Sequence, residues 1–198
     1  MRRKSLKSVT FLTPDEVLAV LRVARKRSVR DWCMLAMIYT HGLRAQEAAN
    51  LTMRDLDLKG QQVTIRRLKG SLHTVQPLMG HKGQPLLDEQ KALREWLTVR
   101  PQYYGDALFV SQKGGSLSAT QVYRIFRDVA VDAGLPKAKQ HPHVLKHSVV
   151  THLIQQNMNL AKVKQFVGHS AISSTMRYVS VSDQEASRDA ANALQNAF

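Results

Sequence analysis

An arginine, a glutamate and a lysine in the first third of the chain are the first residues that could do chemistry. Arg44 stands at an expected helix start, and Glu47, three residues on, can pair with it. Lys69 lies at the tip of an expected hairpin. Guanidinium and ammonium groups bind anionic oxygens, and a guanidinium can hold two at once. Taken singly, Arg44 also fits a surface ion pair, and Lys69 fits a solvated turn residue.

Histidines, a lysine and a tyrosine in the last third form a second group. His143 and Lys146 open an expected helix, His169 follows a glycine, and Tyr178 comes nine residues later. An imidazole can form hydrogen bonds or carry a proton near neutral pH, and a phenol can act as a nucleophile. Each also has a structural interpretation: a capping histidine, a local packing residue or a half-buried aromatic ring.

Other catalytic and cofactor motifs are missing from the sequence. It contains no Walker loop, no dinucleotide-binding glycine fingerprint, no His-Glu-x-x-His and no Gly-x-Ser-x-Gly. Cys33 is the single cysteine, which excludes an internal disulfide and a cysteine-based zinc cluster. His143 and His147 lie four apart on one expected helix, but no carboxylate or thiol stands near them to complete a metal site. We therefore predict no metal and no cofactor.

The chain is strongly basic. Its 198 residues include 29 Lys and Arg against 15 Asp and Glu, a formal net charge of +14. Such a surplus attracts polyanions, because neutralised phosphates release their condensed counterions. The basic residues are spread along the chain rather than gathered on one aromatic-rich amphipathic helix, which favours nucleic acid over a membrane. With no long apolar stretch and no signal sequence, we expect a cytoplasmic protein that binds double-stranded DNA.

The apolar pattern predicts a mainly α fold with one small antiparallel β-sheet. Residues 13–16, Thr-Pro-Asp-Glu, predict a helix start with a capping box. A second helix is expected over 30–41, ending at Gly42, and its nearly all-round apolar surface makes it central. Alternating residues predict strands over 62–68 and 72–78. Further helices are expected near residue 45, over 85–99, from Ser118 to Ala133, and through most of the last third with breaks near Asn157 and Gly168.

The serial order of the polar residues resembles the tyrosine recombinase (phage integrase) family. Catalytic domains of that family carry Arg, Lys, His-x-x-Arg, His or Trp, and Tyr in this order, and the resemblance runs from about Thr13 to Ser180. The segment 65–69, Ile-Arg-Arg-Leu-Lys, with Thr74-Val75 and Pro77-Leu78, is similar to short stand-alone members that invert bacterial fimbrial promoters. Each motif alone is weak, whereas five in order with compatible spacing are specific.

The resemblance implies a tyrosine recombinase catalytic-domain-like fold and a site-specific DNA recombinase. Its site residues would be Arg44, Lys69, His143, Lys146, His169 and Tyr178. Tyr178 would attack a DNA phosphate, leaving a 3′-phosphotyrosyl bond and a free 5′-hydroxyl, and a second strand's hydroxyl would reverse the step without ATP or metal. Charge accumulates on the nonbridging oxygens during phosphoryl transfer, so fixed cations suit the reaction. Lys69 would protonate the leaving oxygen, and the histidines would donate hydrogen bonds or take the phenol proton.

The resemblance also implies an organisation and an assembly. Residues 1–12 form a basic arm, 13–180 the catalytic and DNA-binding domain, and 181–198 a tail helix with an apolar stripe. Most relatives carry an N-terminal core-binding domain where this chain has only the arm. We therefore expect DNA binding and site selectivity to depend on this one domain and on contacts between copies. We expect a homo-oligomer assembled on DNA, a dimer on each site and a tetramer in synapsis, with the tail docked on a neighbour. Packing of the tail on its own domain is the alternative.

One position departs from the family pattern, because Lys146 stands where the family has arginine. Lysine keeps the charge but loses the planar fork, and the loss of one preorganised donor costs about 2.7–4 kcal/mol. Three explanations stay open: a slow natural enzyme, an attenuated variant that traps a DNA complex, or a regulator that binds without cutting. The alternatives to a recombinase are therefore a noncatalytic DNA-binding regulator on the same scaffold and a relaxing enzyme of the type IB topoisomerase kind.

Overall fold

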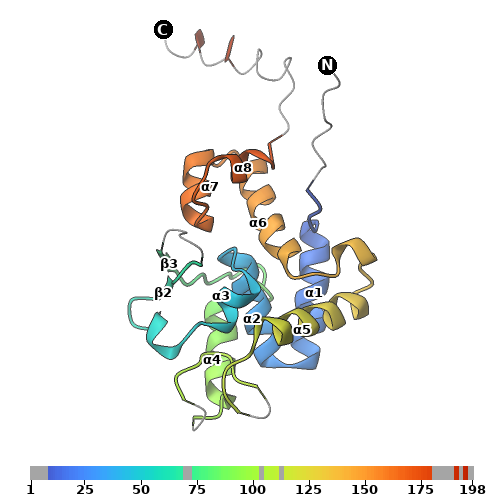
Figure 1. Ribbon diagram of the computed structural model, residues 1–198, viewed down its shortest axis with the longest axis vertical. Helices are drawn as coiled ribbons and strands as arrows, with labels where there is room; N and C mark the ends of the chain where they lie inside the picture. The colour runs from blue at the N-terminus through green and yellow to red at the C-terminus, as the bar shows by residue number, and fades with distance from the viewer. Residues whose placement is uncertain are drawn as a thin grey trace.

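The computed structural model describes residues 9–68, 73–102, 105–111 and 114–179, together with 190–191 and 194–195. These residues form a mostly helical fold with one small antiparallel sheet (Figure 1), which confirms the predicted fold class. Across the described part of the chain, every helix is too short or too polar to cross a membrane.

The first two helices follow the predicted signals closely. α1, Pro14–Arg27, begins at a capping box in which the Thr13 side chain accepts from the Glu16 amide and the Glu16 carboxylate accepts from the Thr13 amide. α2, Val29–Thr40, is buried along nearly its whole length. The chain then turns at Gly42, whose φ of +57° is a left-handed conformation that glycine adopts at little cost.

The other helices lie close to the predicted positions. The remaining elements are α3 (Ala45–Ala49), β1 (Leu56–Asp57), β2 (Gln62–Ile65), β3 (Thr74–Pro77), α4 (Glu89–Val99), α5 (Ala119–Asp132), α6 (His143–Gln155), α7 (Leu160–Val167) and α8 (Ser173–Met176), with 3₁₀ turns at Met53–Asp55 and Lys137–Lys139. The helix expected over 85–99 begins only at Glu89, because Asp88 caps it. The predicted breaks are confirmed at Asn157 and Gly168, which have φ of +59° and +68°.

The sheet is a three-stranded antiparallel meander in the order β1-β2-β3. Its register pairs Leu56 with Val63 and Thr64 with Val75. The two-residue strand β1 is not signalled by the sequence pattern. β2 is shorter than predicted, because Arg67 and Leu68 leave the ladder and donate hydrogen bonds to other parts of the fold.

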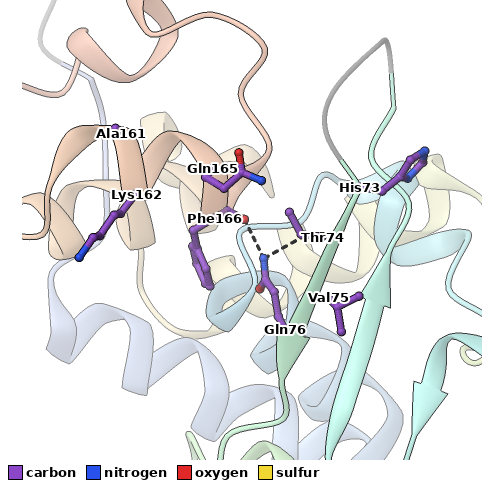
Figure 2. A pocket seen from close by; sticks show the side chains of 8 residues that line it. All are labelled: His73, Thr74, Val75, Gln76, Ala161, Lys162, Gln165 and Phe166. Atoms are coloured by element: carbon purple, nitrogen blue, oxygen red, sulfur yellow. Dashed lines mark hydrogen bonds between the residues drawn. The ribbon is translucent and has the colours of Figure 1, made fainter.

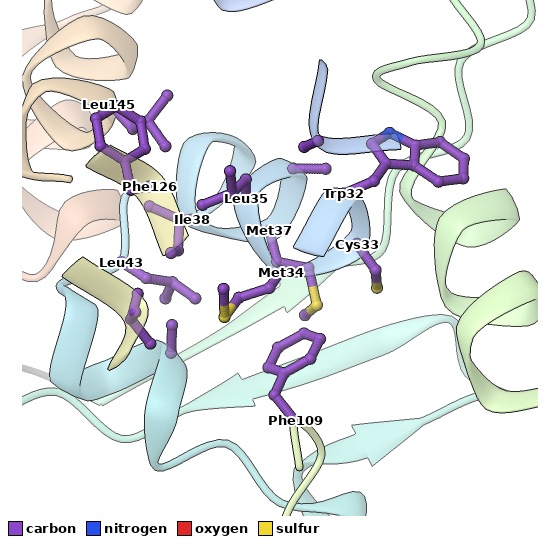
Figure 3. Packing of buried hydrophobic residues seen from close by; sticks show 14 of the residues in the cluster. Trp32, Cys33, Met34, Leu35, Met37, Ile38, Leu43, Phe109, Phe126 and Leu145 are labelled. Atoms are coloured by element: carbon purple, nitrogen blue, oxygen red, sulfur yellow. The ribbon is translucent and has the colours of Figure 1, made fainter. Parts of the chain in front are cut away.

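Helix α2 is the centre of the main hydrophobic core, and α1, α4 and α6 pack against it. Figure 3 shows Met34 and Met37 of α2 above Phe109, a residue of the short apolar run 107–110. Phe126 of α5 and Leu145 of α6 close the core from the other side of α2. The core therefore fixes α6 and the end of α2, the two elements that lead into the candidate site.

A second, smaller apolar cluster joins α6 to α7. It contains Val149, Val150, Val163 and Val167, with Tyr39, Phe166 and Tyr178 packed on its rim. The segment before α1 lies along α6. The Leu12 amide donates to Ser148 Oγ at 2.8 Å, and the Thr10 carbonyl lies 3.3 Å from His147 Nδ1.

Both predicted appendages lie largely outside the described residues. Residues 9–12 are the described part of the basic arm. Residues 190–191 and 194–195 are the described part of the tail, and all four are helical.

Candidate active site

Arg44 is held at the start of α3 by Glu47. The Arg44 Nη1 donates to Glu47 Oε1 at 2.5 Å, and the Arg44 amide donates to Glu47 Oε2 at 2.8 Å, so the predicted pair is confirmed. The Glu47 side chain is fully buried, whereas the Arg44 side chain is 30 % exposed. Although burial raises the pKa of Glu47, the charge of Lys146 and the bonds from Arg44 hold it below its usual value. Arg44 is thus anchored at one edge and open to solvent at the other.

Glu47 also holds the root of the β2–β3 turn. The Leu68 amide donates to Glu47 Oε1 at 3.3 Å, and Arg67 Nη1 donates to Glu47 Oε2 at 3.2 Å. Lys69 is the next residue, and it lies outside the described residues. The structure therefore places the root of its turn on the carboxylate that anchors Arg44, and the Lys69 side chain stays a prediction.

The first turn of α6 carries His143 and Lys146. His143 is exposed as a whole residue, but its ring is partly buried. This partial burial, followed by the charges of His141 and Arg44, lowers the pKa of His143. Lys146 is 5 % exposed, and its Nζ donates to the carbonyls of Gly42 at 2.5 Å and Val167 at 3.0 Å. Burial, and then the charge of Arg67, lower the pKa of Lys146 to about 7.

His169 follows the left-handed Gly168 at the end of α7. It is 8 % exposed, and its Nδ1 lies 3.0 Å from Thr175 Oγ1 of α8. Burial, and then the charges of Lys146 and Arg44, lower the pKa of His169 to about 4. The ring is therefore neutral at pH 7.

Tyr178 lies beside His147 of α6. Its half-buried ring meets the His147 ring edge to face, with the centroids 5.7 Å apart. Burial raises the pKa of Tyr178, and the charge of Arg177 partly opposes that effect. Within the described residues, no hydrogen bond joins Tyr178 to Arg44 or His143.

The structure thus brings four of the six predicted site residues into one electrostatic neighbourhood. Arg44 and Lys146 lie close enough to His143 and His169 to shift the pKa of both rings. Tyr178 packs against His147. His147 lies one helical turn along α6 from His143.

A buried hydrogen-bond network, called here the polar seam, runs beneath these residues and was not predicted. Its members are His41, Glu47, Arg67, Gln76 and Glu89. His41 Nε2 lies 2.5 Å from Glu89 Oε1 and His41 Nδ1 lies 2.7 Å from Gln76 Oε1, while Gln76 Nε2 donates to the Phe166 carbonyl at 2.7 Å. One signal was present in the sequence: Val63, Ile65 and Arg67 alternate, so a strand turns all three to its buried face.

A groove opens beside the polar seam, between β3 and α7 (Figure 2). It has a volume of about 560 Å³. Val75, 63 % exposed, lies on its β3 side, and Phe166 and Lys162 lie on its α7 side. The Gln76 amide bridges the floor of the groove to α7 and to Thr74.

The mostly helical domain with its small antiparallel sheet has the fold of a tyrosine recombinase catalytic domain. The sequence pattern of the Phage integrase family matches residues 10–185. The chain therefore belongs to the phage integrase, or tyrosine recombinase, family.

Two curated relatives are similar over most of their length. The chain is 34% identical over 174 residues to the Type 1 fimbriae regulatory protein FimE of Escherichia coli K12, covering 85% of this chain and 84% of FimE. It is 32% identical over 177 residues to FimB of the same strain, covering 87% and 84%. These relatives agree with the predicted resemblance to fimbrial phase-switch recombinases.

Solved structures support the same fold. XerH site-specific recombinase bound to its difH substrate, in a pre-cleavage complex, is 25% identical with a TM-score of 0.77, covering 96% of this chain and 56% of that one. The catalytic domain of bacteriophage HP1 integrase is 21% identical with a TM-score of 0.60, covering 86% and 87%. The chain thus spans about half the length of XerH and most of the HP1 catalytic domain.

Proposed function

We propose that this chain is a site-specific DNA recombinase that cuts and rejoins DNA through Tyr178. The observation that carries the proposal is the anchoring of Arg44 by Glu47, within electrostatic reach of His143 and His169. The similarity to FimE and to DNA-bound XerH supports DNA as the substrate. Such an activity needs access to chromosomal DNA, so we propose a cytoplasmic, nucleoid-associated protein.

The proposed reaction transfers a phosphoryl group from DNA to the phenol and back. Arg44 binds two nonbridging oxygens of the phosphate, and the Tyr178 oxygen attacks phosphorus as the bond to the 5′-oxygen breaks. His143 takes the phenol proton, because its lowered pKa leaves the ring neutral at pH 7. Lys69 protonates the leaving 5′-oxygen, and His169 donates a hydrogen bond.

Lys146 is the basis for proposing a slow reaction. Its ammonium group donates to two backbone carbonyls, and an ammonium lacks the fork that binds two phosphate oxygens. The loss of one such donor slows an enzyme by about 100- to 1,000-fold. The same observation favours the second candidate, a noncatalytic DNA-binding regulator built on this scaffold.

The test uses a pool of nicked duplexes with randomised sequence, so that no target site is assumed. A nick traps the covalent intermediate, and adducts that survive denaturant are isolated and their DNA is sequenced. We expect the wild type to form adducts, and we expect the same of Tyr123→Phe, a matched change on the exposed side of α5. Tyr178→Phe is expected to form none. DNA binding without an adduct, even after Lys146→Arg, would favour the regulator. Relaxation of supercoiled plasmid without recombinants would favour a topoisomerase.

We further propose that copies assemble on DNA through the tail, as a dimer on each site and a tetramer in synapsis. The tail is acidic in a basic chain, with Asp183, Glu185 and Asp189 against Arg188. The groove between β3 and α7 offers apolar side chains and the cation Lys162, so we propose it as the receptor on the neighbouring copy.

The assembly test measures the mass of protein–DNA complexes in solution. Deleting residues 183–198 is expected to leave monomers on DNA, and Lys162→Glu is expected to weaken assembly. Lys137→Glu, an equal charge change on an exposed turn, serves as the control. Unchanged assembly after the deletion would contradict docking of the tail on a neighbouring copy.

A further inference from the structure

Arg67, just beyond β2, is a buried cation that the proposed reaction does not use. Its side chain has no exposed area. Its terminal nitrogens donate to the Glu47 carboxylate at 3.2 Å and to the carbonyls of Gly42 at 3.0 Å, His41 at 2.8 Å and Phe166 at 2.9 Å. One guanidinium therefore reaches α3, the α2–α3 junction and α7.

Each of these segments carries a site residue. The α2–α3 junction and α3 flank Arg44 on its two sides, and the end of α7 leads within three residues to His169. Arg67 itself stands two residues before Lys69. The Arg67 side chain thus joins residues 41–47 and the end of α7 to its own segment after β2, and these three parts are far apart in sequence.

We infer that Arg67 is a positioning residue for the phosphate-binding site: its buried hydrogen bonds set the places of Arg44, of residues 67–68 and of His169 relative to one another. The inference deepens the proposed function and rests on it for the role of Arg44.

Stability alone does not account for a guanidinium at this position. Buried ion pairs are often no more stabilising than apolar side chains of similar volume. The Arg67 Nε atom is buried without a hydrogen-bond partner, which is a further cost. The property that a guanidinium has and an apolar side chain lacks is the set of directed bonds, which fixes three backbone segments in one arrangement.

Gly168 shows how closely the end of α7 is fitted to Arg67. A Cβ atom at residue 168 would lie 2.7 Å from Arg67 Cγ and 2.9 Å from Arg67 Cδ, closer than real Cβ contacts allow. The residue also has a φ of +68°. The backbone that leads into His169 therefore rests directly on the aliphatic stem of Arg67.

The test compares Arg67→Met with Arg66→Met. Arg66 is the adjacent arginine, but its side chain is 63 % exposed and pairs with Asp55 at 3.0 Å, so the same charge is removed outside the polar seam. Each change is combined with Arg44→Ala in a double-mutant cycle. Two quantities are measured at a temperature at which circular dichroism shows every variant folded: the single-turnover rate of adduct formation on a selected nicked duplex, and the affinity for a short intact duplex.

The inference predicts that Arg67→Met and Arg44→Ala are not additive. In the otherwise unchanged chain, Arg44→Ala is expected to slow adduct formation about 100- to 1,000-fold. After Arg67→Met, it is expected to slow it about tenfold or less, because Arg44 is already misplaced. After Arg66→Met, the full effect of Arg44→Ala is expected to return. An equal effect of Arg44→Ala in all three backgrounds would overturn the inference.

The two measurements keep this inference separable from the proposed function. If the wild type forms no adduct, the proposed function fails, and the cycle on DNA affinity alone decides whether Arg67 positions Arg44. If Arg67→Met does not fold, Arg67→Lys replaces it, because lysine keeps the charge and drops the fork. Full additivity of Arg67→Lys with Arg44→Ala would then overturn the inference.

Discussion

The core around α2 and the polar seam are both buried, but different forces hold them. Around α2 the contacts are apolar, as between Met34 and Phe109, and such contacts have no preferred direction. In the polar seam each contact is a directed hydrogen bond, as from Arg67 to Glu47. A core of this kind accepts side chains of similar volume, whereas a hydrogen-bond network loses its geometry when one member changes. The core thus maintains the fold, and the polar seam maintains the site.

The largest expected effect comes from removing the carboxylate of the polar seam. Glu47→Ala leaves Arg44, Arg67 and Lys146 without their shared counter-charge, and breaking a buried pair costs about 3–5 kcal/mol. The free energy of unfolding in urea measures the loss. Glu95→Ala, which removes a half-exposed partner of Arg25, is the control and is expected to cost about 0–1 kcal/mol. Equal losses in the two variants would show that the Glu47 carboxylate does not stabilise the buried cations of the site.

A comparable loss of stability in the core is expected to leave the reaction intact. Leu35 is fully buried in α2, so Leu35→Ala is expected to cost about 2–5 kcal/mol of unfolding free energy. At a temperature at which the variant remains folded, its single-turnover rate of adduct formation on saturating DNA is expected to equal that of the wild type. A rate of adduct formation that falls together with stability would contradict the view that the core affects stability and the polar seam affects the reaction rate.

A smaller effect is a dependence of the unfolding free energy on pH, and it comes from the buried Lys146 beside the polar seam. Burial and the charge of Arg67 lower the pKa of Lys146 from 10.5 to about 7, so above that pH the folded chain has lost a proton that the unfolded chain still binds. The folded state is penalised below pH 7, and the penalty is relieved as the pH rises.

Relative to Lys146→Met, the unfolding free energy of the wild type is therefore expected to rise by up to about 1.4 kcal/mol per pH unit between about pH 7 and pH 9. Urea unfolding at several pH values measures the slope. Parallel curves for the two proteins would mean that Lys146 keeps its ordinary pKa in the fold.

The smallest expected effect lies outside both regions, at the first helix cap. Thr13→Ala removes one side of the capping box of α1 and is expected to cost about 1 kcal/mol. It is expected to change neither the rate of adduct formation nor the dependence of stability on pH. Thermal unfolding measures the loss, and Thr98→Ala on the exposed side of α4 is the control.

Local signals in the sequence predicted most of the helices because their causes are local. Thr13 with Glu16, and Ser118 with Gln121, satisfy backbone amides within one turn, and Gly42 ends α2 through its own conformation. The strand β1 escaped prediction because two residues carry no period, and its pairing to β2 depends on the fold. Helix α4 starts late because Asp88, rather than the apolar pattern, sets its first residue.

The candidate site could be predicted only as a set of residues. The order of Arg44, His143, His169 and Tyr178 is a property of the sequence, and so is the pairing of Arg44 with Glu47, three residues away. The burial of Lys146 against two carbonyls, and the place of Tyr178 on His147, depend on how α6, α7 and the α2–α3 junction pack together. These contacts join residues 21 to 104 positions apart in the sequence, and no local pattern specifies them.

The His147 Nδ1 atom lies 3.3 Å from the Thr10 carbonyl oxygen, and the Tyr178 ring packs edge to face with the His147 ring. The segment at Thr10 therefore contacts the same imidazole on which the Tyr178 ring packs. A purification tag ahead of Thr10 is therefore best removed before adduct formation is measured, because it is joined to the segment that contacts His147.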